Sequence, residues 1–87
     1  MKTVIFQHKA FKEFTDWAEA DKKIFRKIHS LIKEIDRNPF TGEGKPEPLK
    51  HELKGFWSRR ITIEHRFVYT ISENNEIIIA SCKNHYC

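Results

Sequence analysis

The chain has 87 residues, enough for one domain over 1–87 but too short for separate cofactor and substrate domains. Seven Phe, two Trp and two Tyr provide the bulk of a core, which excludes a wholly disordered chain. Lysine and arginine total 16 against 12 acidic residues, a net charge of +4 at pH 7. That excess suits a polyanionic partner, although moderately basic small proteins are common.

The N-terminus and the cysteines indicate the compartment. Residues 1–6 hold one lysine and a very short apolar run, which is not the pattern of a signal peptide. No stretch approaches the ~20 apolar residues of a membrane span. Cys82 and Cys87 would lie too far apart on an extended strand to form a disulfide. We therefore expect a reduced, cytoplasmic chain without membrane association.

The first half of the chain predicts a short strand and two helices. Val4–Phe6 is an apolar strand candidate, and the aromatic residues of Phe11–Trp17 recur at helical spacing, typical of a core stripe rather than a binding platform. Asp21 is placed to cap a second helix. Asn38 and Pro39 end that helix, because proline disfavours the helical conformation of the residue before it. Its apolar face collects Ile24, Ile28, Leu31, Ile32 and Ile35.

The second half predicts a loop followed by antiparallel strands. Residues 39–48 hold all three prolines and two of the three glycines, which is typical of a surface loop. Strands are predicted over 50–53, 56–63, 66–71 and 76–82, with turns between them. Ile77–Ala80 shows no alternation, so we expect a central strand covered on both faces. The result is an α+β fold with two N-terminal helices packed on one face of a mainly antiparallel twisted sheet.

Side-chain alternation predicts which strand residues share a face. The apolar residues of the predicted strands 56–63 and 66–71 share a face only if the loop between the paired residues has an odd number of residues, and Arg60 and Arg66 then share the opposite face. The core face then receives Trp57, Arg59, Ile61, Ile63, Phe67, Tyr69 and Ile71. A two-residue turn at 74–75 would reverse the parity, unless a β-bulge shifts the register. With this two-residue turn, Ile78, Ala80 and Cys82 belong to the core face. The residues assigned to the arginine face are Ile77, Ile79, Ser81, Lys83 and His85.

Two arginines and a histidine on one face suit chemistry at a phosphate. The donor fork of arginine matches phosphate oxygens, and histidine exchanges a proton near neutral pH. RNA cleavage by the neighbouring 2′-OH needs a base, an acid and charge stabilisation at phosphorus, but no metal. Glu47 is the candidate base, because Pro46 and Pro48 hold it extended at low entropy. The alternatives are a solvated loop glutamate, and for His85 a frayed terminal residue.

Other candidates also have simple structural explanations. Lys50 is a phosphate contact or a surface residue, and Tyr86 stacks on a base or packs on its own domain. The turn residues His51 and His65 are expected to be solvated, and for Arg59 we favour a solvated strand residue.

Neither a metal site nor a cofactor is expected. Cys82, His85 and Cys87 lie close together in the sequence, but a zinc site needs a fourth ligand or a spaced pair. No compact group of carboxylates suggests a two-metal site.

Several motifs closely resemble the YoeB (Txe) toxins of the RelE/ParE superfamily of toxin–antitoxin systems. They are NPF at 38–40, GEGKPEPLK at 42–50, GFWSRRI at 55–61, EHRFVY at 64–69 and the His-Tyr pair at 85–86. The resemblance covers essentially the whole chain. It implies a RelE-like βααβββ fold and a homodimer. It also implies a ribosome-dependent endoribonuclease that cuts mRNA in the ribosomal A site, arrests translation and is neutralised by a YefM-type antitoxin.

The resemblance assigns roles by position. Glu47 matches the family's general base and His85 its general acid. Arg66 matches the arginine that stabilises the phosphorane, and Arg60 matches a phosphate-binding arginine. The residues that match those placing the RNA are Lys50 and Tyr86.

Two other functions remain open. A non-catalytic protein would block translation by binding RNA or the ribosome through the same basic face, and its inhibition would survive Glu47→Gln. Another branch of the superfamily inhibits DNA gyrase, but that branch is not expected to carry this set of Glu, Arg and His.

Overall fold

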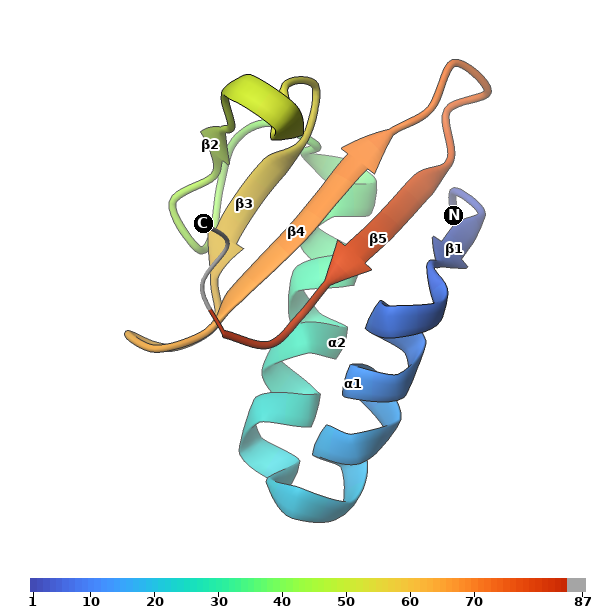
Figure 1. Ribbon diagram of the computed structural model, residues 1–87. Helices are drawn as coiled ribbons and strands as arrows, with labels where there is room; N and C mark the ends of the chain where they lie inside the picture. The colour runs from blue at the N-terminus through green and yellow to red at the C-terminus, as the bar shows by residue number, and fades with distance from the viewer. Residues whose placement is uncertain (85–87) are drawn as a thin grey trace.

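A computed structural model describes residues 1–84, which form a five-stranded sheet covered on one face by two helices (Figure 1). The elements are β1 (Val4–Phe6), α1 (His8–Ala20), α2 (Lys22–Arg37), β2 (Glu47–Pro48), the 3₁₀ helix η1 (His51–Leu53), β3 (Trp57–Arg60), β4 (Arg66–Ile71) and β5 (Ile77–Ser81). The strand order is β1-β5-β4-β3-β2, with β1 parallel to β5 and the other neighbours antiparallel. The α+β class and the mainly antiparallel sheet are confirmed. No helix of this part of the chain is long and apolar enough to span a bilayer.

Asp21 explains the sharp connection between the two helices. Its backbone is extended, with φ −156°, so α1 ends there. Its carboxylate Oδ1 accepts the N–H groups of Lys23 (3.0 Å) and Ile24 (3.3 Å), which caps the first turn of α2. The second helix ends at Arg37, directly before Asn38. Both the predicted cap and the predicted end are confirmed.

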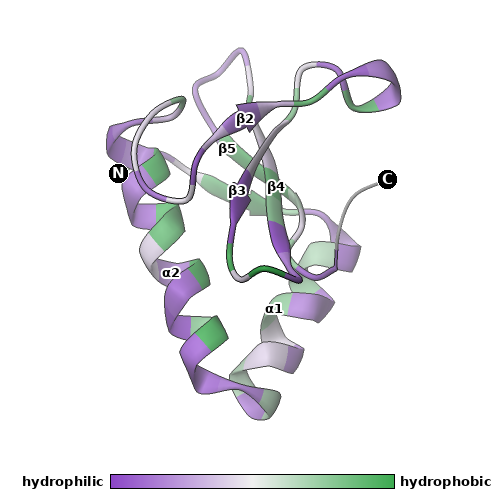
Figure 2. Ribbon diagram, turned by 90° about the vertical axis from the view of Figure 1, so that its left-hand side faces the viewer, coloured by the Kyte–Doolittle hydropathy of each residue, from purple (hydrophilic) through white to green (hydrophobic). Residues whose placement is uncertain are grey.

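The core lies between the helices and the sheet. The apolar stripe of α2 is turned toward α1 and the sheet (Figure 2). Phe14 and Trp17 pack against the core, as predicted, but Phe11 is 55% exposed and meets the ring of Phe6 edge-on. The buried core residues are Ala10, Ile28, Leu31, Ile32, Ile35, Ile61, Phe67, Tyr69, Ile77, Ile79 and Cys82.

The segment between α2 and β3 differs from the prediction. Residues 50–53 were predicted as a strand, but His51–Leu53 form η1, with Lys50 directly before it. β2 lies earlier, in what we expected to be loop. His51 has φ 58°, which is incompatible with a continuous strand. The strand predicted over 56–63 ends at Arg60, so Ile63 is not a core residue and is 92% exposed.

The turn before β5 has one residue more than predicted. The Ser72 N–H donates to the Glu76 carbonyl (2.9 Å), which leaves residues 73–75 in the turn, with Asn75 at φ 61°. An odd turn makes odd-numbered residues of β5 oppose odd-numbered residues of β4. Ile77 and Ile79 are therefore fully buried in the core, and their assignment to the arginine face was wrong.

A β-bulge restores the predicted parity at the end of β5. The register shifts between Val68 and Tyr69, so that Val68 lies opposite Ser81. Ser81 consequently belongs to the arginine face, and the fully buried Cys82 belongs to the core, both as predicted. β5 lies inside the sheet, but its outer face is only partly covered. The residues wrongly assigned to the core are Ile78 and Ala80, which are partly buried.

Candidate active site

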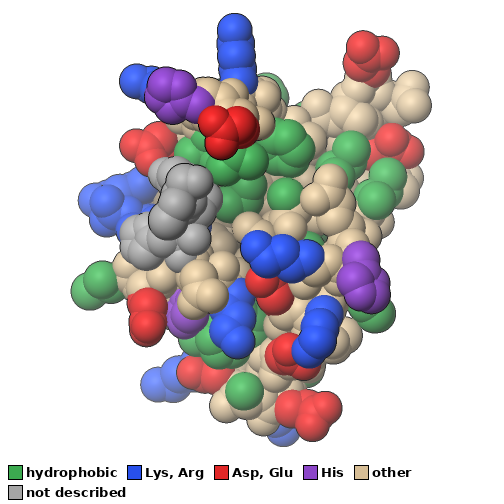
Figure 3. All heavy atoms as spheres, in the orientation of Figure 1, with side chains coloured by type: hydrophobic (Ala, Val, Ile, Leu, Met, Phe, Trp, Pro, Cys, Tyr) green, Lys and Arg blue, Asp and Glu red, His purple; other side chains and the backbone are tan. Residues whose placement is uncertain are grey.

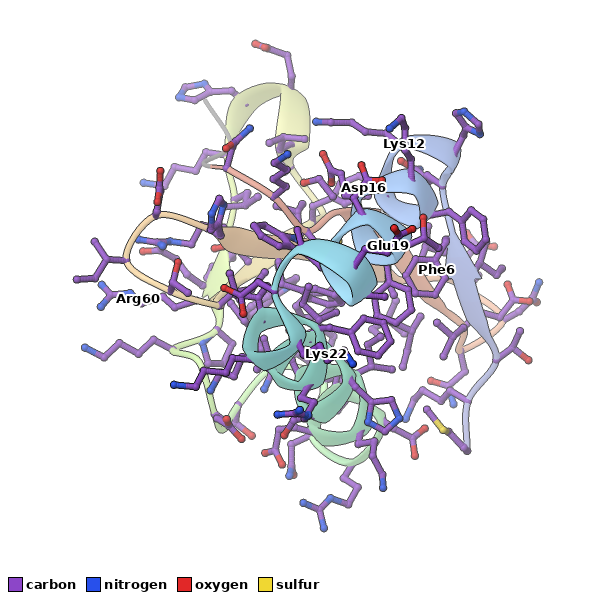
Figure 4. All side chains as sticks on the ribbon, turned by 90° about the horizontal axis from the view of Figure 1, so that it is seen from below. Phe6, Lys12, Asp16, Glu19, Lys22 and Arg60 are labelled. Carbon is purple, nitrogen blue, oxygen red and sulfur yellow. The ribbon has the colours of Figure 1, made fainter. Side chains whose placement is uncertain are left out.

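Arg60 and Arg66 lie directly opposite each other in the antiparallel pair of β3 and β4. Their side chains belong to the face of the sheet away from the helices, because the alternate residues Arg59 and Phe67 are buried on the other side. Arg60 points outward, away from the helix hairpin marked by Lys22 (Figure 4). The prediction that alternation brings the two arginines to one face is confirmed.

A concavity of about 340 Å³ opens beside these arginines. Its lining residues are Lys45, Pro46, Glu47, Pro48, Ser58, Arg60 and Arg66. Glu47 reaches it because β2 pairs with β3, with Glu47 opposite Ser58, two residues before Arg60 on the same face. Lys45 was not singled out from the sequence, where the available signal was its position two residues before Glu47. We call this feature the site concavity.

Cations outnumber carboxylates in the lining of the site concavity. In Figure 3, which looks onto the outer face of the sheet, Lys and Arg side chains (blue) lie along the left edge, where Figure 1 places β2 and β3, and also over the middle of the view. In the site concavity one carboxylate, that of Glu47, is set among Lys45, Arg60 and Arg66. Such an arrangement attracts a phosphate group and keeps a carboxylate close to it.

On both sides of Glu47 the backbone is anchored to β3 or to the residue directly before it. Before it, the Arg60 N–H donates to the Gly44 carbonyl (2.7 Å), and after it, the Leu49 N–H donates to the Phe56 carbonyl (2.9 Å). Gly44 has φ 87°, and a Cβ there would lie 3.0 Å from the Arg59 Cβ. The glycine thus permits the close approach of this loop to β3. A firmly held Glu47 backbone is what the hypothesis of a positioned base requires.

Arg66 is oriented by the loop that precedes it. Its Nη1 donates to the carbonyls of Thr62 (2.7 Å), Ile63 (3.0 Å) and His65 (3.2 Å). Within residues 1–84, the hydrogen bonds of this guanidinium all come from Nη1. As far as residues 1–84 are concerned, Nε and Nη2 are left for an anion in the site concavity.

Arg59 is buried, and the expectation of a solvated strand residue was wrong. Its exposed fraction is 0%. Its guanidinium donates to Tyr69 Oη (3.1 Å) and to the carbonyls of Glu43 (2.9 Å), Thr41 (2.9 Å) and Asn38. These bonds hold residues 38–43, which lead into the site concavity, against β3. Its core-face position in the alternation was the sequence signal for this burial.

His65 is also buried rather than solvated. Its exposed fraction is 9%, and its ring packs edge-on against Trp17, with centroids 4.9 Å apart. Its Nδ1 accepts the N–H of Asn84 (2.8 Å), whose carbonyl in turn accepts the Arg66 N–H (3.0 Å). The other turn histidine, His51, is exposed as expected.

The remaining predicted site residues are not brought into the site concavity by the described part of the chain. Lys50 is exposed and borders a neighbouring concavity of about 410 Å³, formed by Glu47–Leu53. Glu47 borders both concavities. His85 and Tyr86 directly follow Asn84 and lie outside the described residues.

Cys82 is a poor candidate ligand for a metal. Burial, with the nearby Glu13 carboxylate adding to it, raises the pKa of its thiol to about 12, so the thiol stays protonated at neutral pH. In residues 1–84, no three His, Cys, Asp or Glu side chains are grouped so that they could hold a metal ion. Cys87, like His85, lies outside the described residues.

Comparison with known proteins identifies the family. Residues 6–86 match the family described as YoeB-like toxin of bacterial type II toxin–antitoxin system. Toxin YoeB of Escherichia coli (strain K12) is 51% identical to this chain over 83 residues, which are 95% of this chain and 98% of that toxin.

Solved structures of YoeB toxins have the same fold as this chain. The YoeB/ParE toxin from Agrobacterium tumefaciens superposes with a TM-score of 0.94 at 41% identity, covering 99% of this chain and 100% of that one. From Staphylococcus aureus, a YoeB dimer gives a TM-score of 0.89 at 49% identity, with 98% of each chain covered. A YoeB–YefM complex from the same organism gives 0.90 at 47% identity, with 99% of each chain covered. This chain therefore belongs to the YoeB-like toxins of bacterial type II toxin–antitoxin systems and has their RelE-like α+β fold.

Proposed function

We propose that this toxin is an endoribonuclease that cleaves mRNA in the ribosomal A site, depends on the ribosome, and thereby arrests translation. The observation that carries the proposal is the site concavity, in which Glu47 lies with Arg60, Arg66 and Lys45. A base and several phosphate-binding cations in one small hollow are the groups that metal-independent cleavage through the 2′-OH requires.

The reaction assigns one task to each group. Glu47 removes the proton of the 2′-OH, and the 2′-oxygen attacks the adjacent phosphorus. Arg66 neutralises the charge that develops on the phosphorane oxygens, while Arg60 holds the phosphate. The bond from phosphorus to the 5′-oxygen then breaks, and His85 donates a proton to that oxygen. The products are a 2′,3′-cyclic phosphate and a free 5′-hydroxyl, and no metal or cofactor takes part.

Two further residues place the RNA in this proposal. Lys50 borders the concavity next to the site concavity, where its ammonium group would bind a flanking phosphate. Tyr86 would stack on a base. The assignment of His85 rests on its place in the sequence after Asn84, whose carbonyl accepts the Arg66 N–H.

We propose the same kinds of partners for this toxin as those named for its relatives. The S. aureus complex of YoeB with YefM supports a YefM-type antitoxin, and the S. aureus YoeB dimer supports a homodimer. An open basic face suits an acidic segment that folds on binding. A toxin whose target is the translating ribosome would act in the cytoplasm. Co-purification with the product of a neighbouring short reading frame, and the mass of the isolated toxin in solution, test these proposals.

Primer extension on a defined mRNA in a reconstituted translation system tests the activity. We expect new ends within A-site codons with the wild type and with Glu73→Gln, a control glutamate exposed in the remote turn before β5. Glu47→Gln should lower the cleavage rate by about 10²–10⁴-fold, as for a lost base. A ribosome-free arm, with and without EDTA, should give no cleavage.

The same experiment separates the alternatives. Translation arrest without new RNA ends, retained in Glu47→Gln, would replace the nuclease with a non-catalytic binder. In that case charge reversal at Lys50, Arg60 or Arg66 should still weaken the arrest. Inhibition of DNA supercoiling by gyrase would instead support the third function.

A further inference from the structure

Beyond β5, the chain is tied to helix α1 by two hydrogen bonds at one residue. The Cys82 N–H donates to the carboxylate Oε1 of Glu13 (2.8 Å), and the Trp17 indole Nε1–H donates to the Cys82 carbonyl (2.9 Å). Cys82 itself is fully buried. Its backbone groups are thus both satisfied by side chains of one helix, which fixes the chain at this point.

Two residues further on, a second pair of hydrogen bonds holds Asn84. Its N–H donates to His65 Nδ1 (2.8 Å), and its carbonyl accepts the Arg66 N–H (3.0 Å). Asn84 has φ 62°, a left-handed conformation that asparagine adopts more readily than most residues. The two bonds therefore hold a turn in the chain directly beside Arg66.

The imidazole of His65 is itself held in one orientation. Its ring edge meets Trp17, and the backbone N–H of the same residue donates to Thr62 Oγ1 (3.1 Å). Because Nδ1 accepts a hydrogen bond, it carries no proton, so the neutral ring has its hydrogen on Nε2, which lies 3.9 Å from Glu64 Oε1. The ring thus presents a fixed acceptor to Asn84.

We infer that His65 is a positioning residue: through Nδ1 it fixes Asn84 beside Arg66 and so sets the point from which the chain enters the His85-Tyr86 pair. The inference rests on the proposed function, in which His85 is the general acid. A displacement of about 1 Å in a reacting group costs about 10²-fold in rate, so loss of this acceptor should lower kcat. It should leave KM for programmed ribosomes almost unchanged, because His65 lines neither concavity.

Two substitutions separate the acceptor from the packing of the ring. His65→Phe keeps an aromatic ring against Trp17 and removes the acceptor. His65→Asn removes the ring and keeps an oxygen close to the position of Nδ1. We expect His65→Phe to lower kcat by about 10–100-fold and His65→Asn to retain most of it. A purely structural role predicts the reverse order, since the phenylalanine preserves the packing.

Hydrogen exchange of the Asn84 amide supplies a readout that does not depend on RNA cleavage. We expect protection in the wild type and in His65→Asn, and faster exchange in His65→Phe. Imidazole nitrogen chemical shifts should show Nε2–H and an unprotonated Nδ1 in the wild type. Thermal unfolding of each variant confirms that a folded protein is compared.

The outcomes distinguish this inference from the proposed function. A folded His65→Phe with wild-type kcat, or equal Asn84 exchange in both variants, would overturn the inference while leaving the nuclease in place. A wild type that cleaves no RNA would overturn the proposed function and with it the catalytic purpose of the contact. The exchange difference would then report a structural anchor alone.

Discussion

Arg59 and Arg60 are consecutive residues of β3, yet Arg59 is completely buried and Arg60 is exposed. The alternation of a strand places them on opposite faces. Arg59 gathers the backbone carbonyls of the loop that follows α2, whereas Arg60 borders the site concavity. Two consecutive arginines therefore have different roles: Arg59 stabilises the fold, and Arg60 offers its charge to a ligand.

Replacing Arg59 should destabilise the protein much more than replacing Arg60. Arg59→Met leaves several carbonyls without their donor, and we expect the free energy of unfolding to fall by about 2–4 kcal/mol. Arg60→Met removes an exposed side chain and should change it by about 0.5 kcal/mol or less. Urea unfolding of both variants measures the difference. Equal destabilisation would show that the loop is held by other contacts.

The two like charges of Arg60 and Arg66 should lower the free energy of unfolding. Like charges directly opposite in an antiparallel sheet are destabilising, so Arg60→Thr should raise the free energy of unfolding by about 0.2–1 kcal/mol while weakening RNA binding. Added salt or phosphate should stabilise the wild type more than the variant, because it screens or occupies the site. Thermal unfolding at low and high salt tests this, and an identical salt response would contradict it.

Stability should fall on the alkaline side because of Cys82. Burial raises the pKa of its thiol to about 12, above the value of 9.0 of an unperturbed thiol. Above pH 9 the unfolded chain loses this proton while the folded protein keeps it, so stability is lost as the pH rises toward 12. The loss is at most about 1.4 kcal/mol per pH unit.

Cys82→Ala serves as the comparison for this pH dependence. Urea unfolding at pH 7, 9 and 10 should give a smaller loss for the variant than for the wild type. A residual decline is expected near pH 10 and above, because burial also raises the pKa of Tyr69. Parallel curves for both proteins would show that Cys82 ionises equally in the folded and unfolded chains.

The cap of the second helix should be worth about 1 kcal/mol. Asp21→Ala removes the acceptor of two N–H groups, and we expect the free energy of unfolding to fall by about 0.5–2 kcal/mol. Asp16→Ala is the matched control, since within residues 1–84 this aspartate makes an exposed pair with Lys12, and its loss should lower the free energy of unfolding by about 0.3–0.5 kcal/mol. Denaturant unfolding compares them, and an equal effect of both would remove the special role of Asp21.

Much of the site could be predicted from local patterns. Alternation alone brought Arg60 and Arg66 to one face, and the two prolines around Glu47 indicated an extended segment that the structure pairs with β3. The roles of these residues in catalysis, and those of His85 and Tyr86, stay predictions. Lys45 and the buried Arg59 were not assigned to the site region, because their positions depend on how the loop before β2 lies against β3.

By itself, the sequence determined what short-range chemistry controls: the cap at Asp21, the helix end before Pro39 and the period of the strands. Tertiary structure decided the register of β5, where the longer turn and the β-bulge reverse the parity twice and return Cys82 to the core. It also decided the partners of Arg59 and His65, which are 21 residues from Asn38 and 19 from Asn84 along the chain. A pattern of period two or 3.6 carries no information about contacts at such separations, because they form only when the sheet and the loops have packed together.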